Sequence, residues 1–389
     1  MSLFPYNTDI HDSWMLQAVE LAEQGRGRVE PNPMVGCVVV KNGVRINQGF
    51  HQRFGESHAE VNALSGLDVS ETIDSTIYVT LEPCAHFGKT PPCVDLLIKS
   101  RPRLVVVGLE DPFPEVSGRG IRRLREAGID VLLNVQRDAC TQLVAPYLKR
   151  IKTGLPWIIA KWAMTLDGRL ATYSGNSKWV TSDVARQHAH RVRSNMDGML
   201  VGIGTLLADD PKLTARPLGS DAIESHRYSV PGDRIPIRMV MDRAVRTPLD
   251  SQLVRSSGTY RTVIACGPDA NKMRIKLLQS SGCEVVVCSN DHLPTMIREL
   301  TKPLVQSGMT NLLVDGGPRL IGAFMDHQMV DEVHVYIAPK VIGGVPTVVP
   351  NRGDGVLTMD LARKFTVGRW EILGEDMFFT GLCDNPKGT

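Results

Sequence analysis

The chain has 389 residues, more than one ordinary domain needs, so we expect two or three domains of about 100 to 200 residues each. Hydrophobic residues make up 42% and charged residues 22%, which is typical of a globular protein that buries sizeable cores. The 44 basic and 42 acidic residues nearly cancel, which excludes the electrostatic footprint of a polynucleotide-binding protein but not a small anionic substrate.

No targeting or membrane segment is expected. Residues 1–12 lack a basic segment followed by an apolar core, and no apolar run approaches the roughly 18 residues of a membrane helix. The eight cysteines are scattered, without the density of a disulfide framework. We therefore expect a cytoplasmic protein that contacts no membrane.

Helices and strands alternate over the first 133 residues, which is typical of an α/β domain. In chain order we expect a helix over 13–25, a strand over 35–40, a helix from His58, a strand over 76–81, a helix over 93–99, a strand over 104–108, a helix over 118–127 and a strand over 129–133.

Three residues of this region have the types and order of catalytic zinc ligands: His58, Cys84 and Cys93. A structural zinc usually has four protein ligands, whereas a catalytic zinc has three and keeps one position open. Glu60 follows the histidine by two residues and is placed to move a proton as general acid and base. This order of residues is the signature of hydrolytic zinc deaminases that act on an amino-substituted heterocycle.

Two other interpretations of these residues stay open. Single histidines and cysteines are most often buried packing residues. A closed structural site would need a fourth ligand, for which His86 is the nearest candidate, and would describe a zinc-stabilised binding protein with no need for Glu60.

Longer motifs surround these residues, in the segments 31–38 (PNPMVGCV), 51–60, 82–93 and 111–121. Together they resemble the pyrimidine deaminase of riboflavin biosynthesis. The eight residues between Cys84 and Cys93 also differ from generic cytidine deaminases, in which two are usual. The resemblance implies a cytidine-deaminase-like three-layer fold and substrate contacts from Asn32, His51, Lys89 and Thr90. Asn32 could instead be a turn residue between two prolines.

The composition changes after a helical stretch over 138–152, where Thr153-Gly154-Leu155-Pro156 precedes an apolar strand that begins at Trp157. We therefore expect a zinc-dependent pyrimidine deaminase domain over 1–152 and a second domain over 153–389. The second region contains no zinc motif, so it is not a copy of the first.

The second region contains motifs that are weak singly and informative in order. They are Lys161-Trp162-Ala163-Met164-Thr165-Leu166-Asp167-Gly168, Gly175-x-Ser177-x-Trp179, His190-x2-Arg193, Val201-Gly202-Ile203-Gly204-Thr205, Asp209-Asp210-Pro211-x-Leu213-Thr214-x-Arg216 and Asp315-Gly316-Gly317-Pro318. Gly316 and Gly317 follow a predicted strand and precede a predicted helix, so their backbone N–H groups could face a phosphate.

In this order the motifs resemble the pyrimidine reductase fused behind that deaminase in bacterial riboflavin biosynthesis, a domain similar in fold to dihydrofolate reductase. The resemblance implies an NADPH site lined by Ala163, Trp179, Thr205, Asp209, Gly317, Pro318, Arg319, Leu320, Ile321, Gly322 and Ala323. It implies a substrate site formed by Ser177, Arg193, Leu213, Arg216 and Asp315.

The residues themselves support part of this set. Arg193 and Arg216 supply the forked donors that an anionic phosphoribosyl group requires. Position 315 departs from the pattern, since we expect glutamate there and the shorter aspartate could contact a sugar hydroxyl through water.

Two roles in the reductase remain open at this stage. Lys161 and Asp209 are both candidates for its acid, and Lys161 could equally be structural. Arg243 and Arg246 are candidates for binding the 2′-phosphate that distinguishes NADPH.

We therefore predict a bifunctional, zinc- and NADPH-dependent enzyme of riboflavin biosynthesis that acts on a small phosphoribosylaminopyrimidine. The resemblance suggests a homo-oligomer. The alternative is a nucleic-acid or nucleoside zinc deaminase with an accessory domain, which should show a basic, aromatic-rich channel. With 5% aromatic residues and balanced charge, the composition does not favour it.

Overall fold

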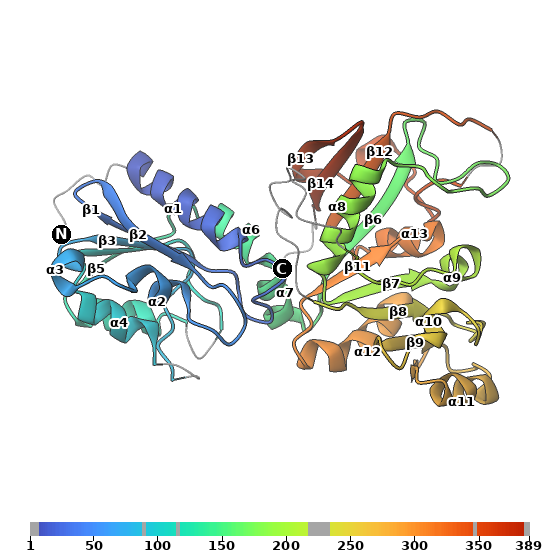
Figure 1. Ribbon diagram of the computed structural model, residues 1–389, viewed down its shortest axis with the longest axis horizontal. Coiled ribbons are helices and arrows are strands. Elements are labelled where there is room, and N and C mark those ends of the chain that lie inside the picture. Colours follow the sequence, from blue (N-terminus) through green and yellow to red (C-terminus); the bar gives the residue numbers. More distant parts are fainter. Residues whose placement is uncertain (1–7, 88–90, 114–116, 217–233, 345–347, 385–389) are drawn as a thin grey trace. The chain divides into compact units, whose positions relative to one another are not determined.

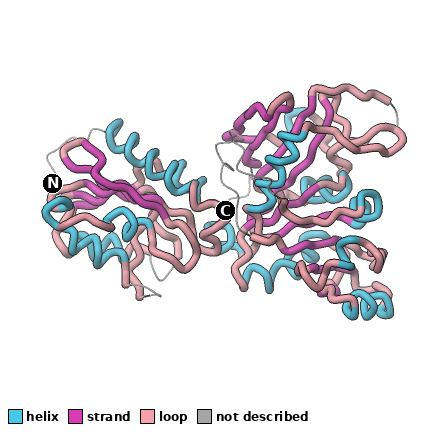
Figure 2. Tube along the Cα trace, viewed as in Figure 1, coloured by secondary structure: helices cyan, strands magenta, loops and turns pink. Residues whose placement is uncertain are grey.

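The computed structural model describes residues 8–87, 91–113, 117–216, 234–344 and 348–384 (Figure 1). They form two compact units that divide between Ile151 and Lys152. Figure 2 shows helices and strands interleaved in both units, so the α/β prediction is confirmed for each.

The first unit contains a five-stranded sheet and seven helices among its described residues. The strands are β1 (Gly36–Lys41), β2 (Val44–Phe50), β3 (Thr76–Val79), β4 (Leu104–Val107) and β5 (Asp130–Leu133). The helices are α1 (Thr8–Glu23), α2 (Ala59–Leu64), α3 (Val69–Thr72), α4 (Cys93–Ser100), α5 (Arg119–Glu126), α6 (Arg137–Leu143) and α7 (Ala145–Thr153).

The strand order is β2-β1-β3-β4-β5, with β1 antiparallel to β2 and β3, and β3, β4 and β5 parallel. Side chains of a strand point alternately to its two faces, and both faces of β1 are buried. Val38 packs in one apolar cluster with Met15 of α1. Val39 packs in a second cluster with Ala63 of α2 and Leu97 of α4. The unit therefore has three layers, with helices on each face of the sheet (Figure 1).

Two predicted helical stretches differ from the observed helices. Helix α1 begins at Thr8 and ends at Glu23, whereas the apolar periodicity had indicated residues 13–25. The stretch expected to be helical over 138–152 is two helices, separated at Val144. Pro146 explains the break, because proline has no N–H to donate into a continuous helix and its ring clashes with the preceding turn.

The second unit contains a nine-stranded sheet. Its strands are β6 (Trp157–Thr165), β7 (Gly198–Gly202), β8 (Ile237–Met241), β9 (Thr262–Cys266), β10 (Glu284–Val287), β11 (Asn311–Asp315), β12 (Glu332–Ala338), β13 (Phe365–Leu373) and β14 (Asp376–Cys383). Its helices are α8 (Asp183–Ser194), α9 (Ile203–Asp209), α10 (Gln252–Arg255), α11 (Lys272–Ser280), α12 (Leu293–Gln306), α13 (Pro318–Asp326) and the short 3-10 helix η1 (Met359–Leu361).

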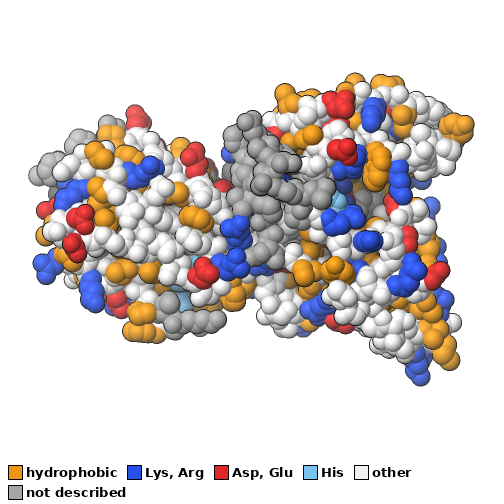
Figure 3. Space-filling view, in the orientation of Figure 1, with side chains coloured by type: hydrophobic (Ala, Val, Ile, Leu, Met, Phe, Trp, Pro, Cys, Tyr) orange, Lys and Arg blue, Asp and Glu red, His pale blue; other side chains and the backbone are white. Residues whose placement is uncertain are grey.

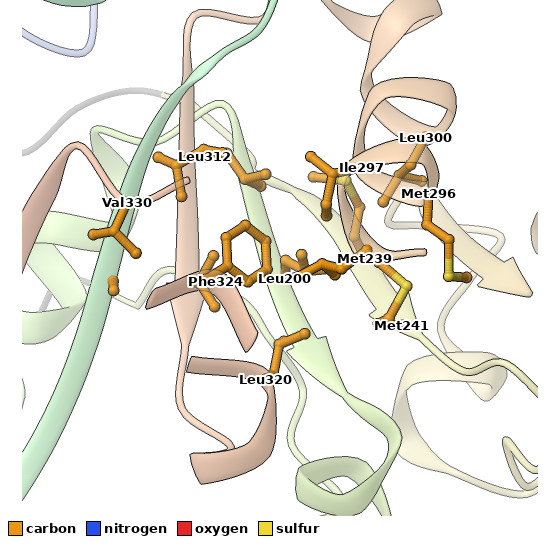
Figure 4. Packing of buried hydrophobic residues seen from close by; sticks show 14 of the residues in the cluster. Leu200, Met239, Met241, Met296, Ile297, Leu300, Leu312, Leu320, Phe324 and Val330 are labelled. Carbon is orange, nitrogen blue, oxygen red and sulfur yellow. The ribbon is translucent and has the colours of Figure 1, made fainter. Parts of the chain in front are cut away.

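The strand order is β10-β9-β8-β7-β11-β6-β12-β14-β13. The first seven strands of this order, from β10 through β12, are parallel to their neighbours. Strands β14 and β13 extend the sheet beyond β12, and each pairs antiparallel with its neighbour. Helices α12 and α13 cover one face of the sheet and helices α8 to α11 the other. Figure 4 shows the first of these cores, where Phe324 of α13 lies beside Leu200 of β7 and Ile297 of α12 packs near Met239 of β8.

The surface in Figure 3 carries acidic and basic side chains interspersed over both units on the face shown, in keeping with the nearly equal numbers of the two kinds. Within the described part of the chain, no helix combines the length and the apolar character needed to cross a bilayer.

Candidate active sites

The structure brings together the three residues predicted to bind zinc. His58 immediately precedes α2, Cys84 lies in the loop after β3, and Cys93 is the first residue of α4. One ligand atom from each lies within 4.8 Å of the others. The Nδ1 atom of His58 is 3.6 Å from Sγ of Cys84 and 3.3 Å from Sγ of Cys93.

This geometry fits zinc. Zn–S and Zn–N bonds of about 2.3 and 2.1 Å at a tetrahedral angle place ligand atoms about 3.6 Å apart. A hydrogen bond from the Cys93 side chain lowers the pKa of the Cys84 thiol, and His58 adds to the effect. The backbone N–H of Cys93 also donates to Cys84 Sγ at 3.3 Å. Ready ionisation suits a metal ligand, because zinc binds the thiolate.

Glu60 lies on the buried face of α2, two residues after His58, with 3% of its surface exposed. Burial raises the pKa of its carboxyl to about 7, and the neighbouring Cys84 contributes to the rise. A group whose pKa lies near neutral pH can both accept and return a proton under working conditions.

A cavity of about 380 Å³ opens beside the cluster. Asn32 and His51 line it, and Nδ2 of Asn32 is 3.3 Å from Nε2 of His51. The other ring nitrogen of His51 is 3.0 Å from the Ser57 carbonyl oxygen, which fixes the orientation of the ring. Lys89 and Thr90 fall outside the described residues. His86 lines the cavity but is not among the three clustered ligand residues.

The sequence did not single out Glu82, yet it organises the cavity wall. Its carboxylate accepts hydrogen bonds from the backbone N–H groups of Asp111, Gly118, Gly120 and Ile121, at 2.9 to 3.3 Å. The loop after β3 is thereby tied to the loop after β4. The position of Glu82 directly before Pro83 and Cys84 was the feature of the sequence that could have indicated this role.

In the second unit, two glycine-containing strand-to-helix connections lie side by side at the carboxyl ends of neighbouring strands. Strand β11 pairs with β7, and the turns that follow them lead into α13 and α9. Gly316 and Gly317 have φ angles of 82° and 89°, a region that side chains strongly disfavour. A Cβ atom on Gly317 would lie 3.0 Å from Oγ1 of Thr205. The missing side chain leaves a cradle at this edge, as close approach of a cofactor phosphate requires.

The predicted cofactor residues differ in what they can offer a ligand. Leu320 and Ile321 are buried in the core, so their side chains pack inward and only their backbone could serve a cofactor. Gly322 packs against the backbone of Arg352 and Gly353. The remaining members are partly or fully exposed: Ala163, Trp179, Thr205, Asp209, Pro318, Arg319 and Ala323. The Trp179 ring is stacked by the guanidinium of Arg186, 4.5 Å from its centre.

Three of the charged residues in the expected reductase site form one buried group. Asp315 accepts a hydrogen bond from Lys161 Nζ at 3.0 Å and from Arg193 Nε at 2.9 Å. Arg193 Nη2 also bonds to the same carboxylate oxygen as its Nε. The sequence had placed Arg193 and Asp315 separately against the substrate, whereas the structure pairs them with each other.

This ion group sets the protonation of its members. Burial alone would raise the pKa of Asp315, but Arg193 and Lys161 outweigh it and hold the pKa well below its ordinary value. Burial lowers the pKa of Lys161 and the nearby Arg193 adds to the effect, which Asp315 offsets only in part. Asp209, the other candidate acid, is exposed, and partial burial of its carboxyl raises the pKa.

The remaining predicted substrate and cofactor contacts are less tightly grouped. Leu213 is buried with a φ of 48°, and the backbone N–H of the exposed Arg216 lies 3.3 Å from Nδ1 of His190. Ser177 is half-buried. Arg243 forms an exposed ion pair with Asp291 at 3.4 Å.

Comparisons with known proteins match both units. Residues 8–109 match the family described as the cytidine and deoxycytidylate deaminase zinc-binding region, and residues 156–378 match the RibD C-terminal domain. The chain is 38% identical to the riboflavin biosynthesis protein RibD of Actinobacillus pleuropneumoniae, over 98% of this chain and 97% of that protein. It is 39% identical to the Escherichia coli protein of the same name, over 85% and 88%.

Solved structures agree over the same span. Acinetobacter baumannii RibD matches with a TM-score of 0.80 at 32% identity, covering 97% of this chain and 100% of that one. A diaminohydroxyphosphoribosylaminopyrimidine deaminase/5-amino-6-(5-phosphoribosylamino)uracil reductase from Thermotoga maritima matches with a TM-score of 0.77 at 30% identity, covering 97% and 100%.

Proposed function

Since the chain belongs to the RibD family of riboflavin biosynthesis, a bifunctional deaminase and reductase, we propose how its residues divide the two reactions. The predicted fold class is confirmed: a cytidine-deaminase-like domain precedes a dihydrofolate-reductase-like one. The alternative of a nucleic-acid or nucleoside deaminase with an accessory domain is not favoured, because relatives match across both units.

The enzyme hydrolyses the amino group of 2,5-diamino-6-(5-phosphoribosylamino)pyrimidin-4(3H)-one to give 5-amino-6-(5-phosphoribosylamino)uracil and ammonia. It then reduces the ribosyl group with NADPH to give 5-amino-6-(5-phosphoribitylamino)uracil. We assign the first step to residues 1–152 and the second to 153–389.

The observation that supports the deaminase assignment most directly is the placing of three zinc-ligand atoms and the buried carboxyl of Glu60 at one cavity. Zinc, when held by His58, Cys84 and Cys93, supplies Lewis acidity that makes water nucleophilic near neutral pH. Glu60 takes a proton from the attacking water and gives one to the departing amine. Asn32 and His51 orient the pyrimidine ring, together with Lys89 and Thr90.

In the reductase, NADPH supplies a hydride to the open imine form of the ribosylamine. The backbone over 317–323 and the side chains of Ala163, Trp179, Thr205 and Asp209 would hold the cofactor. Ser177, Arg193, Leu213, Arg216 and Asp315 hold the substrate, and Asp315 also fixes the side chains of Lys161 and Arg193. Of the two candidate acids, Lys161 is the better supported, because its lowered pKa eases release of a proton.

The experiment for the deaminase is product analysis of the zinc-loaded enzyme with the diaminopyrimidine, without and with NADPH. Ammonia and the uracil are expected without cofactor, and the ribityl compound when NADPH is added. A Glu60→Gln variant should keep zinc and lose about 100- to 10,000-fold in deamination rate. Glu20→Gln, at an exposed position of α1, is the matched control. Full deamination by a zinc-loaded Glu60→Gln enzyme would refute the assignment.

We further propose a cytoplasmic homo-oligomer that binds neither polynucleotides nor membranes. The balance of 44 basic and 42 acidic residues supports the exclusion of polynucleotides. Light scattering of the purified protein and retention assays on DNA, RNA and lipid vesicles test these points, and a monomeric mass or tight retention would contradict them.

A further inference from the structure

Arg150 lines the deaminase cavity and belongs neither to the zinc cluster nor to the predicted substrate contacts. It lies on α7 and is half-buried. Among the described residues that line the cavity, it is the one Lys or Arg side chain. The same cavity contains His58, Cys84 and Glu60, so the positive charge shares a space with the reacting end of the substrate.

One nitrogen of the Arg150 guanidinium, Nε, is buried without a hydrogen-bond partner among the described residues. Burial lowers the pKa of Arg150, and the one neighbour that acts in the opposite direction is the phenol of Tyr147. Placing a cation in a partly buried site costs free energy unless an anion compensates it. This arrangement therefore suits a site that a bound anion completes.

The acidic residues of the cavity do not supply that anion. Asp111 accepts hydrogen bonds from the Tyr147 hydroxyl at 3.1 Å and the Phe113 backbone N–H at 2.9 Å. Glu82 is committed to four backbone N–H groups. Glu56 lies 3.8 Å from Arg53 in an exposed ion pair. Arg150 thus faces a cavity whose own carboxylates are bound elsewhere or, in the case of Glu60, assigned to the chemistry.

We propose that Arg150 forms the anion subsite of the deaminase and binds the phosphate monoester of the phosphoribosyl substrate. This inference rests on the proposed function and adds a residue to its substrate site. At neutral pH the phosphate is the anionic group of the substrate, and guanidinium matches its oxygens with paired N–H donors. The cavity volume of about 380 Å³ falls in the range of small-ligand sites.

The position of Arg150 predicts which kinetic constant it controls. The phosphate does not change during deamination, so a contact with it binds ground state and transition state equally. Such a contact lowers KM and leaves kcat nearly unchanged. Arg150 is therefore a specificity residue that favours the phosphorylated substrate over its phosphate-free form.

The test uses full-length, zinc-loaded enzyme and follows ammonia release from the phosphorylated diaminopyrimidine and from the same compound after phosphatase treatment. In Arg150→Met, the ratio of kcat/KM for the two substrates should fall about 10- to 100-fold, the range for losing a hydrogen bond to a charged group. The change should appear in KM. Arg150→Lys should keep part of the ratio, and Lys152→Met, exposed on the same helix, should keep all of it.

Inorganic phosphate gives a second readout, because it should inhibit deamination competitively in the wild type and more weakly in Arg150→Met. An unchanged substrate ratio together with unchanged phosphate inhibition would overturn the proposal. So would an equal loss for both substrates in a variant that retains its zinc, since this indicates a role in the fold. If Arg150→Met does not fold, the same two measurements on Arg150→Lys decide.

Failure of this inference can be told apart from failure of the proposed function. If the wild type releases no ammonia, or if Glu60→Gln is fully active, the deaminase assignment itself is wrong. If the wild type deaminates and Glu60→Gln does not, the substrate ratio in the Arg150 variants tests the anion subsite alone.

Discussion

Replacing Asp315 by asparagine should destabilise the second unit by about 3 to 5 kcal/mol, the cost of removing one partner from a buried ion pair. The carboxylate side chain is 8% exposed, and those of Lys161 and Arg193 are 14% and 20% exposed. Both cations depend on this one group, so asparagine leaves two positive charges with little compensation. About 10 °C in Tm corresponds to this loss for a unit of this size.

Urea unfolding followed by tryptophan fluorescence measures the effect, because Trp157, Trp162, Trp179 and Trp370 lie in the second unit and Trp14 alone lies in the first. The matched control is Glu284→Gln, which breaks the exposed pair of Glu284 with Arg261 and should cost at most about 1 kcal/mol. If Asp315→Asn costs no more than this control, the carboxylate does not hold the two cations as we argue.

The pH dependence gives an independent check of the same argument. The pKa of Asp315 is held well below its ordinary value in the folded protein. A depressed pKa contributes stability above the unfolded value, about 3.9, and that stability is lost as pH falls through the folded pKa. The difference in unfolding free energy between wild type and Asp315→Asn should therefore be full at pH 7 and shrink below about pH 4.

Three further predictions concern the metal, the cofactor and acid stability. A chelator should abolish ammonia release but spare NADPH oxidation with the preformed uracil, because the three clustered ligands all lie in the first unit. Added zinc should restore deamination. Loss of both activities on chelation would contradict this separation. Gly317→Ala should raise KM for NADPH about tenfold, because Gly317 has a φ of 89° and a Cβ there would lie 3.0 Å from Oγ1 of Thr205. The control Gly128→Ala, at a φ of 82° with open space around it, should leave this KM unchanged. Equal KM values for the two variants would argue against a cofactor at the Gly317 turn. Burial lowers the pKa of His188 to about 3, so the unfolding free energy of the wild type should fall by up to about 1.4 kcal/mol per pH unit below pH 6.5. His188→Gln should reduce this pH dependence, as measured by urea titrations at pH 7 and pH 5. An unchanged pH dependence would contradict a histidine that is neutral in the folded state.

The sequence predicted the zinc cluster because its ligands belong to short, ordered motifs. His58 and Cys93 each stand at a helix start that the local pattern indicates, and Cys84 follows a recognisable strand. Because eight residues separate Cys84 from Cys93 in the sequence, the distance between their sulfur atoms could not be predicted. The folded structure shows that both lie close to His58. Helix ends were predicted less well: the polar start of α1 shows no apolar periodicity, and Pro146 divides α6 from α7.

Long-range pairing could not be predicted. Lys161 and Arg193 lie 154 and 122 residues from Asp315 along the chain, and no local pattern records that they meet. Arg150 was missed for a different reason, since a single arginine on a helix is most often solvated. Its significance depends on a cavity that only the structure shows.

The two sites therefore depend on the fold in different ways. The deaminase ligands flank one strand and come from 36 consecutive positions, 58 to 93, so a local segment defines the chemistry. The reductase residues come together because β11 inserts between β6 and β7, which places Lys161, Asp315 and the start of α9 near the carboxyl ends of neighbouring strands. Disturbing Asp315 should hence weaken stability and reduction together, whereas disturbing Arg150 should change substrate preference with little effect on stability. Measuring both quantities for both variants separates a residue that assembles a site from one that only recognises a ligand.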